Sequence, residues 1–176
     1  MVDTEVPVTA DAKPRSGPME AIAGIATAGA GLALLGLVMV QAWQVFARYV
    51  MNDSPSWTEP VTLLLLSTAM GLGAAAGVHA NRHFGFYLLA DALPMRWKRM
   101  QHAFAALVIA FIGAVIATWA ARLLIDGIDI RMAGAPLPQS IPYLPLAVGG
   151  ALMTVFALGQ LYESLRAVVV PAAKVR

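Results

Sequence analysis

The fold is decided by the segment ARYVMNDSPSWTE, residues 47–59. It separates an uncharged run of 27 residues, 21–47, from a second uncharged run of 22 residues, 60–81. Residues 52–55, Asn-Asp-Ser-Pro, favour a chain reversal because Asn and Asp side chains bond their own backbone and Pro fixes φ. The segment therefore predicts a tight hairpin between two helices that cross a membrane.

The edges of this hairpin carry interfacial anchors. Arg48 and Tyr49 close the first apolar run, and Trp57 and Glu59 open the second. Each has an apolar body and a polar tip, which suits the boundary between lipid and water. Because a lone charge at that depth is costly, we expect Arg48 and Glu59 to pair across the hairpin.

The start of the second helix has two possible positions. Ser56 and Glu59 are spaced as in a capping box, with Ser56 as the N-cap. A start at Thr58 accommodates Pro60 better, because proline lacks a backbone donor and fits the first helical turn.

Composition defines the class of protein. Of 176 residues, 59% are hydrophobic and 12% are charged, against about 25% charged in soluble domains. Four uncharged runs, each longer than the roughly 20 residues that cross a bilayer, occupy residues 21–47, 60–81, 100–121 and 132–162. We therefore expect an all-α integral membrane protein with four transmembrane helices in one domain, residues 19–166. Residues 1–18 and 167–176 are read as tails, the first too polar to order itself.

Orientation follows from Lys and Arg. Nine of these residues lie on the side that holds both termini and the middle loop, and three, Arg48, Arg122 and Arg131, lie on the other side. The positive-inside rule then places both termini in the cytoplasm.

Two sets of residues are expected to make contacts along the spans. Ala69, Gly73 and Gly77 share one face of the second helix and predict close packing on another helix of the chain. Ser140 is a candidate N-cap of the fourth helix, and Pro142 and Pro145 stiffen its start.

The middle loop is expected to lie at the cytoplasmic interface as a short interfacial segment. It begins with Arg82 and His83 and leads into a basic aromatic collar on the third helix that contacts lipid headgroups. The collar residues are Arg96, Trp97, Lys98 and Arg99.

Catalytic groups and charged binding groups are expected to be absent from the spans. No Asp, Glu, Lys or Arg lies in the middle of any span, which argues against a self-sufficient carrier of charged solutes. His79, His83 and His102 leave open a haem-binding redox subunit, although solvated histidines are favoured. The chain has no cysteine and no catalytic, metal-binding or nucleic-acid motif. We therefore expect neither an enzyme nor a cofactor, and an enzyme of lipid metabolism is disfavoured for want of an acid–base pair.

A longer pattern resembles a known family. It comprises Arg48-Tyr49-Val50 and Asn52, Ser56-Trp57-Thr58-Glu59, Asn81-Arg82-His83, Leu88-Leu89, Asp91-Ala92-Leu93-Pro94, and Ser140-Ile141-Pro142 with Pro145. This arrangement over about residues 20–166 resembles the small permease subunit (DctQ type) of tripartite ATP-independent periplasmic (TRAP) transporters.

The resemblance implies function and partners. The chain would sit in the bacterial inner membrane and scaffold a large membrane subunit, which carries substrate and sodium. A periplasmic solute-binding protein would deliver organic acid anions, and the remaining contacts would be with the lipid bilayer and not with nucleic acid.

The predicted orientation is testable with single cysteines, because the chain has none of its own. Ser54→Cys and Gln139→Cys should react with an impermeant maleimide in intact cells, and Ser16→Cys should not. The reverse labelling pattern would refute the orientation.

Overall fold

The structure, a computed structural model, describes residues 17–53, 55–80, 95–134 and 137–169. Within them it contains four helices: α1 (Pro18–Val50), α2 (Thr58–His79), α4 (Met95–Asp126) and α5 (Tyr143–Val169). All four are long and apolar enough to cross a membrane. The predicted all-α membrane fold with four spans is confirmed.

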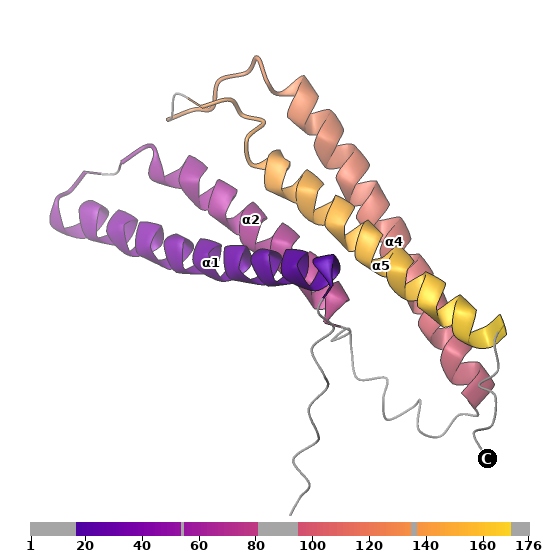
Figure 1. Cartoon of the computed structure of the whole chain (residues 1–176). Coiled ribbons are helices and arrows are strands. Elements are labelled where there is room, and N and C mark those ends of the chain that lie inside the picture. Colours follow the sequence, from indigo (N-terminus) through magenta and orange to yellow (C-terminus); the bar gives the residue numbers. More distant parts are fainter. Residues whose placement is uncertain (1–16, 54, 81–94, 135–136, 170–176) are drawn as a thin grey trace, which may run out of the picture.

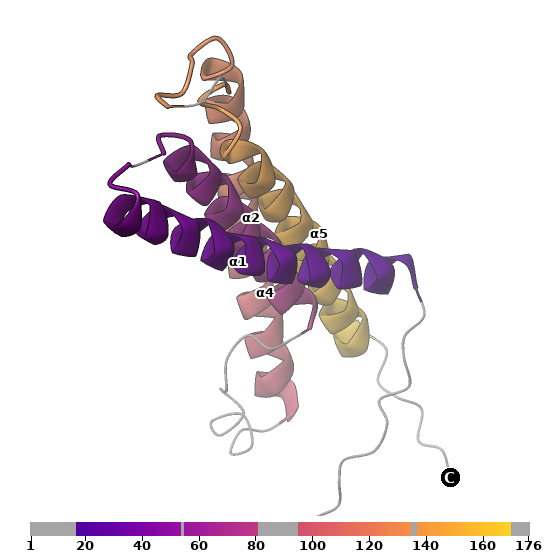
Figure 2. The same cartoon turned by 90° about the vertical axis from the view of Figure 1, so that its left-hand side faces the viewer.

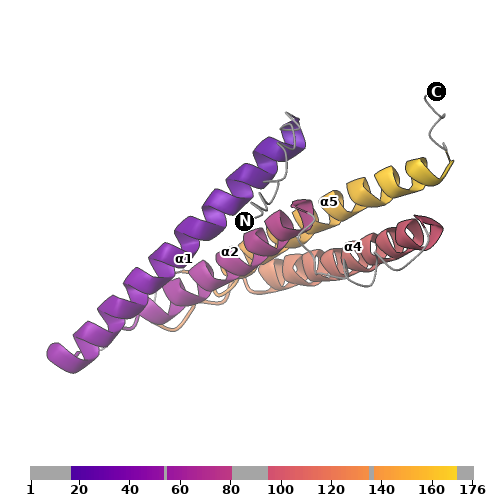
Figure 3. The same ribbon diagram turned by 90° about the horizontal axis from the view of Figure 1, so that it is seen from below.

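The helices form an open row in the order α1, α2, α5, α4 (Figure 1). Helices α1 and α2 make one hairpin, α4 and α5 make another, and α2 packs on α5 between them. Seen from below, α1 lies at one margin of the row and α4 at the other (Figure 3). The four helices do not form a closed bundle.

The two ends of the row differ. The α1–α2 and α4–α5 connections lie together at one end, which we call the hairpin end. The opposite end, which we call the terminal end, holds the start of α1 and the end of α5. Here a cluster of buried side chains from all four helices forms the core: Ala23, Ala75, Val78, Ala110, Met153, Phe156 and Ala157.

Small residues let α1 lie close to α2. Four buried alanines recur at three- and four-residue spacing along one face of α1: Ala23, Ala26, Ala30 and Ala33. On the same helix, a Cβ at Gly29 would lie 3.0 Å from Leu72 of α2, and one at Gly36 would lie 3.4 Å from Leu65. Lipid is as apolar as these side chains, so helix contact relies on such close van der Waals packing. From this contact α1 diverges from the other helices (Figure 2).

The contact between the hairpins is made by glycine backbones. A Cβ at Gly149 of α5 would overlap the backbone of Gly71 of α2, and a Cβ at Gly71 would lie 2.7 Å from the Pro145 carbonyl oxygen. The next residue, Gly150, faces α4 instead, where a Cβ would lie 2.8 Å from the Ala117 nitrogen. Successive helical residues point about 100° apart, so the Gly-Gly pair places α5 against both neighbours.

We predict that Gly149→Ala destabilises the fold by about 1 to 3 kcal/mol, because the methyl group would force the α2 and α5 backbones apart. Gly31→Ala is the matched control, since a Cβ at this helical position meets nothing within 4 Å. Thermal unfolding in detergent micelles, followed by circular dichroism, measures both variants. Equal melting temperatures for the two variants would contradict the close crossing.

Candidate functional site at the hairpin end

The α1–α2 turn is fixed by Asn52. Its φ of 55° makes it the one described non-glycine residue with a left-handed backbone. The N–H groups of Met51 and Asp53, on either side, both donate to the Ala47 carbonyl, at 3.1 and 3.2 Å. Asn is among the few residues that adopt this conformation readily, so Asn52 ends α1 and reverses the chain.

The predicted capping box at the start of α2 is wrong. The N-cap is Trp57, which makes no side-chain cap bond, and α2 begins at Thr58 with Pro60 in its first turn. The buried Thr58 hydroxyl donates to the Pro55 carbonyl at 2.8 Å. Trp57 already has helical backbone angles, so Ser56 lies too early in the chain to cap the helix.

Ser56 instead joins the two hairpins. Its Oγ donates to the Gly134 carbonyl in the α4–α5 loop, at 3.2 Å. Gly134 has φ 87°, and a Cβ there would lie 2.5 Å from the Ser56 carbonyl oxygen. Only glycine satisfies both the angle and the space at this position.

The α4–α5 loop is held by its own backbone. Arg131 and Pro138 form an isolated antiparallel bridge. Met132 N–H donates to the Leu137 carbonyl at 2.9 Å, and Gln139 N–H donates to the Ile130 carbonyl at 2.8 Å. These bonds hold the described part of the loop on both sides of Gly134.

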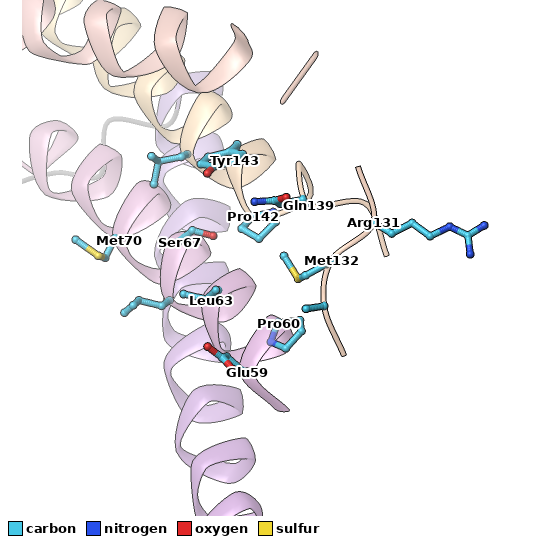
Figure 4. Close-up of a pocket in the computed structure, with 13 residues that line it drawn as sticks. Glu59, Pro60, Leu63, Ser67, Met70, Arg131, Met132, Gln139, Pro142 and Tyr143 are labelled. Atoms are coloured by element: carbon cyan, nitrogen blue, oxygen red, sulfur yellow. The ribbon is translucent and has the colours of Figure 1, made fainter. Parts of the chain in front are cut away.

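The predicted ion pair between Arg48 and Glu59 is also wrong: across residues 17–53 and 55–80 no ion pair joins them. Glu59 lines a cavity together with Leu63 of α2 and Met132 of the α4–α5 loop (Figure 4). Arg48 is exposed in the last turn of α1. Arg48 is not among the residues that line the cavity beside Glu59.

A cavity of about 580 Å³ lies between α2, the α4–α5 loop and the start of α5 (Figure 4). Its wall includes Leu63, Met70 and Leu146, and its polar groups include Glu59 and Gln139. The Arg131 side chain extends away from it (Figure 4). The cavity suits an apolar group and contains no paired acid and base for catalysis.

The start of α5 differs from the prediction. The helix begins at Tyr143, so Ser140 is not its N-cap; the Ser140 carbonyl accepts from Tyr143 N–H at 2.9 Å. Ser140 is buried, and a Cβ at Gly127, just beyond α4, would lie 3.3 Å from its Cβ. Pro142 lines the cavity, and the Pro145 carbonyl faces α2 at Gly71.

The small-residue face of α2 lies against α1. A Cβ at Gly73 would lie 3.8 Å from the Ala30 Cβ, while Ala69 is buried and Gly77 is half-buried. The spacing of small residues did not identify Gly71, although a Cβ there would lie closer to α5 than a Cβ at Gly73 would lie to α1. A role for this face in subunit assembly stays a prediction.

At the terminal end, Gln160 of α5 donates its amide to the Val78 carbonyl near the end of α2. The last carbonyls of a helix have no partner within it, so Gln160 satisfies one of them and ties α2 to α5. The sequence reading missed this contact. The only available signal was a glutamine inside an apolar helix.

The histidines that the structure describes do not form a metal centre. The His79 ring packs on Phe156, with ring centres 4.9 Å apart, and His102 is exposed on α4. Among the described residues no group of three or more His, Cys, Asp or Glu residues could hold a metal ion. His83 lies outside these residues.

Several predicted features lie outside the residues that the structure describes. Arg82 and the interfacial segment lie within residues 81–94, and most of both tails lies within 1–16 and 170–176. The collar, Arg96 to Arg99, lies in the first turns of α4, but only its helical backbone is described.

These features define the class of protein. It is a small helical membrane protein with four continuous spans, whose two hairpins contact each other at their turns through Ser56 and Gly134. The sequence profile described as "Tripartite ATP-independent periplasmic transporters, DctQ component" matches residues 37–167. This is well over half of the chain, so the chain belongs to this family and is a transporter subunit, not an enzyme. No curated protein sequence gives a match.

We predict that Gly134→Ala weakens the contact between the hairpins by about 1 to 3 kcal/mol, because it combines an unfavourable φ with a steric clash. Ser56→Ala should cost less than about 1 kcal/mol, since it removes one exposed hydrogen bond. Unfolding in detergent gives both values, and Ala133→Ser next to Gly134 serves as the neutral control. A Gly134→Ala variant as stable as the wild type would refute the docking of the loop on the turn.

Proposed function

We propose that this chain braces the large membrane subunit of a TRAP transporter during sodium-driven uptake of organic acid anions. In this proposal it lies in the bacterial inner membrane with both termini in the cytoplasm. A periplasmic solute-binding protein delivers the substrate to the assembled complex at the hairpin end. The observation that carries the proposal is family membership over residues 37–167.

The interior of the spans supports a role without substrate contact. Transport sites in secondary transporters use broken helices, whose free backbone groups bind ions and substrate. Within the described residues α1, α2, α4 and α5 are each continuous. No carboxylate or basic group lies in the middle of a span, so sodium and anion contacts are assigned to the large subunit.

The packing supports a rigid brace. The contacts at Gly71, Gly149 and Gly150 bring backbones together with little side-chain freedom to adjust. Ser56 and Gly134 link the hairpins at one end, and Gln160 links α2 to α5 at the other. A part held at both ends can resist tilting while a neighbouring domain moves.

We expect loss of sodium-driven uptake when this chain is deleted from cells that retain the large subunit and the binding protein. Reconstituted alone in liposomes, the chain should give no uptake of labelled organic acid under a sodium or proton gradient. Re-expression of the chain in the deletion strain is the control. Full uptake without the chain, or transport by the chain alone, would refute the proposal.

A further inference from the structure

Most polar side chains within the spans are satisfied by the chain itself. Thr27, Thr68, Thr118 and Thr154 each donate a hydroxyl to the carbonyl four residues earlier on their own helix. Gln160 donates to α2. Such groups need no further partner in lipid.

Gln41 of α1 is different. It is exposed, and its Oε1 accepts a hydrogen bond from the Thr62 hydroxyl of α2 at 3.2 Å. A side-chain amide has two N–H donors as well as an acceptor, and no described residue accepts from Gln41. Gln44, three residues on, is half-buried and likewise has no hydrogen-bond partner among the described residues.

The depth of Gln41 makes these free donors costly. It precedes Arg48 by seven residues, which along a helix corresponds to about 10 Å farther from the membrane edge. Lipid chains offer no acceptor there, so an unsatisfied amide is unfavourable. A protein helix that offers a carbonyl or side-chain oxygen would remove that cost.

Gln41 lies within a shallow apolar surface on the half of α1 nearest the hairpin end. We call this surface the Gln41 face; its residues are Leu37, Val38, Gln41, Ala42, Val45 and Phe46. Along this half α1 has α2 as its neighbour and diverges from α5 and α4 (Figure 1). The rest of the chain therefore leaves the face open.

The far margin of the row gives the contrast. The exposed side chains of α4 include Phe104, Phe111 and Trp119, and its exposed Thr118 is satisfied by its own backbone. The Trp119 indole N–H lies only three residues from Arg122, toward the membrane edge, so the middle of this surface suits lipid chains without further hydrogen bonds. The two margins of the row thus differ in what can cover them.

We propose that the Gln41 face docks a membrane-spanning helix of the large subunit that supplies a hydrogen-bond acceptor to Gln41. The inference rests on the proposed function and names the surface through which that subunit is braced. An acceptor-bearing helix is favoured over a lipid because only the helix completes the hydrogen bonds of the amide at this depth. The α4 margin is left to lipid.

Cross-linking tests which molecule covers the face. Val38→Cys or Val45→Cys, each carrying a benzophenone maleimide, should form an adduct with the large subunit in membranes that contain the whole transporter. Leu107→Cys on exposed α4 is the matched control and should give no such adduct. A cross-link to a second copy of this chain, or no protein adduct at either α1 position, would overturn the proposal.

Substitution tests the hydrogen bond. Gln41→Leu should lower co-purification of the large subunit by about threefold to tenfold, the range expected for one hydrogen bond between membrane helices. The variant should itself remain folded, because leucine suits a lipid-facing position. Thr118→Val on α4 is the control and should co-purify as the wild type does. Unchanged co-purification of Gln41→Leu would overturn the role of the amide.

The two proposals fail differently. If the wild-type chain co-purifies with a large membrane subunit but neither α1 position cross-links to it, the docking surface is wrong and the proposed function stands. If the wild-type chain has no such partner in a complete transporter, the proposed function fails and the docking inference fails with it.

Discussion

The whole row depends on the backbone contact between Gly71 and Gly149. Each hairpin can form from neighbouring helices, but the two hairpins are joined mainly where α2 crosses α5. In lipid there is no hydrophobic gain from burying one apolar side chain against another, so attraction relies on contact distance. Glycine gives the shortest distance, and Gly150 repeats the arrangement toward α4 at Ala117. The crossing therefore sets the positions of all four helices.

The hairpin end is held by different chemistry, as its surroundings require. Residues near the membrane edge can exchange hydrogen bonds with water, so the loops there use polar and backbone groups. Asn52 reverses the chain, and Ser56 and Gly134 join the two turns. Close packing in the spans and turn geometry at the edge thus restrain the same pair of hairpins at two depths.

Hydropathy predicted the number of spans and their approximate places in the chain because lipid allows so few alternatives. Every backbone N–H and C=O in the bilayer core must be bonded, and four long apolar runs can meet this only as helices. The contacts between helices were harder to predict from the sequence. Residues 69–77 of α2 contain small side chains on several faces, so spacing could not show that Gly71 meets α5 while Gly73 meets α1.

The hairpin site shows why local motifs are weaker than long patterns. The sequence placed the turn correctly, and Asn52 proved to have the special backbone conformation that such a turn needs. The capping box and the Arg48–Glu59 pair failed because both considered the hairpin alone. Gly134 of the α4–α5 loop, 78 residues farther along the chain, accepts the hydrogen bond of the Ser56 hydroxyl, and Glu59 lines a cavity with residues of that loop.

An open row has a functional consequence that a closed bundle would not have. A closed bundle turns its small and polar residues inward and presents lipid-compatible side chains all round. A row keeps two free margins, and here the α1 margin carries the amides of Gln41 and Gln44 within the span, whereas the Thr118 hydroxyl of the α4 margin is bonded to its own backbone. Because α2, α5 and α4 are packed through backbone contacts, they form the stiff part of the row, and α1 projects from it at the hairpin end. The proposed bracing role would use this combination: a rigid body, and one helix whose unsatisfied groups would make attachment to a partner more favourable than exposure to lipid.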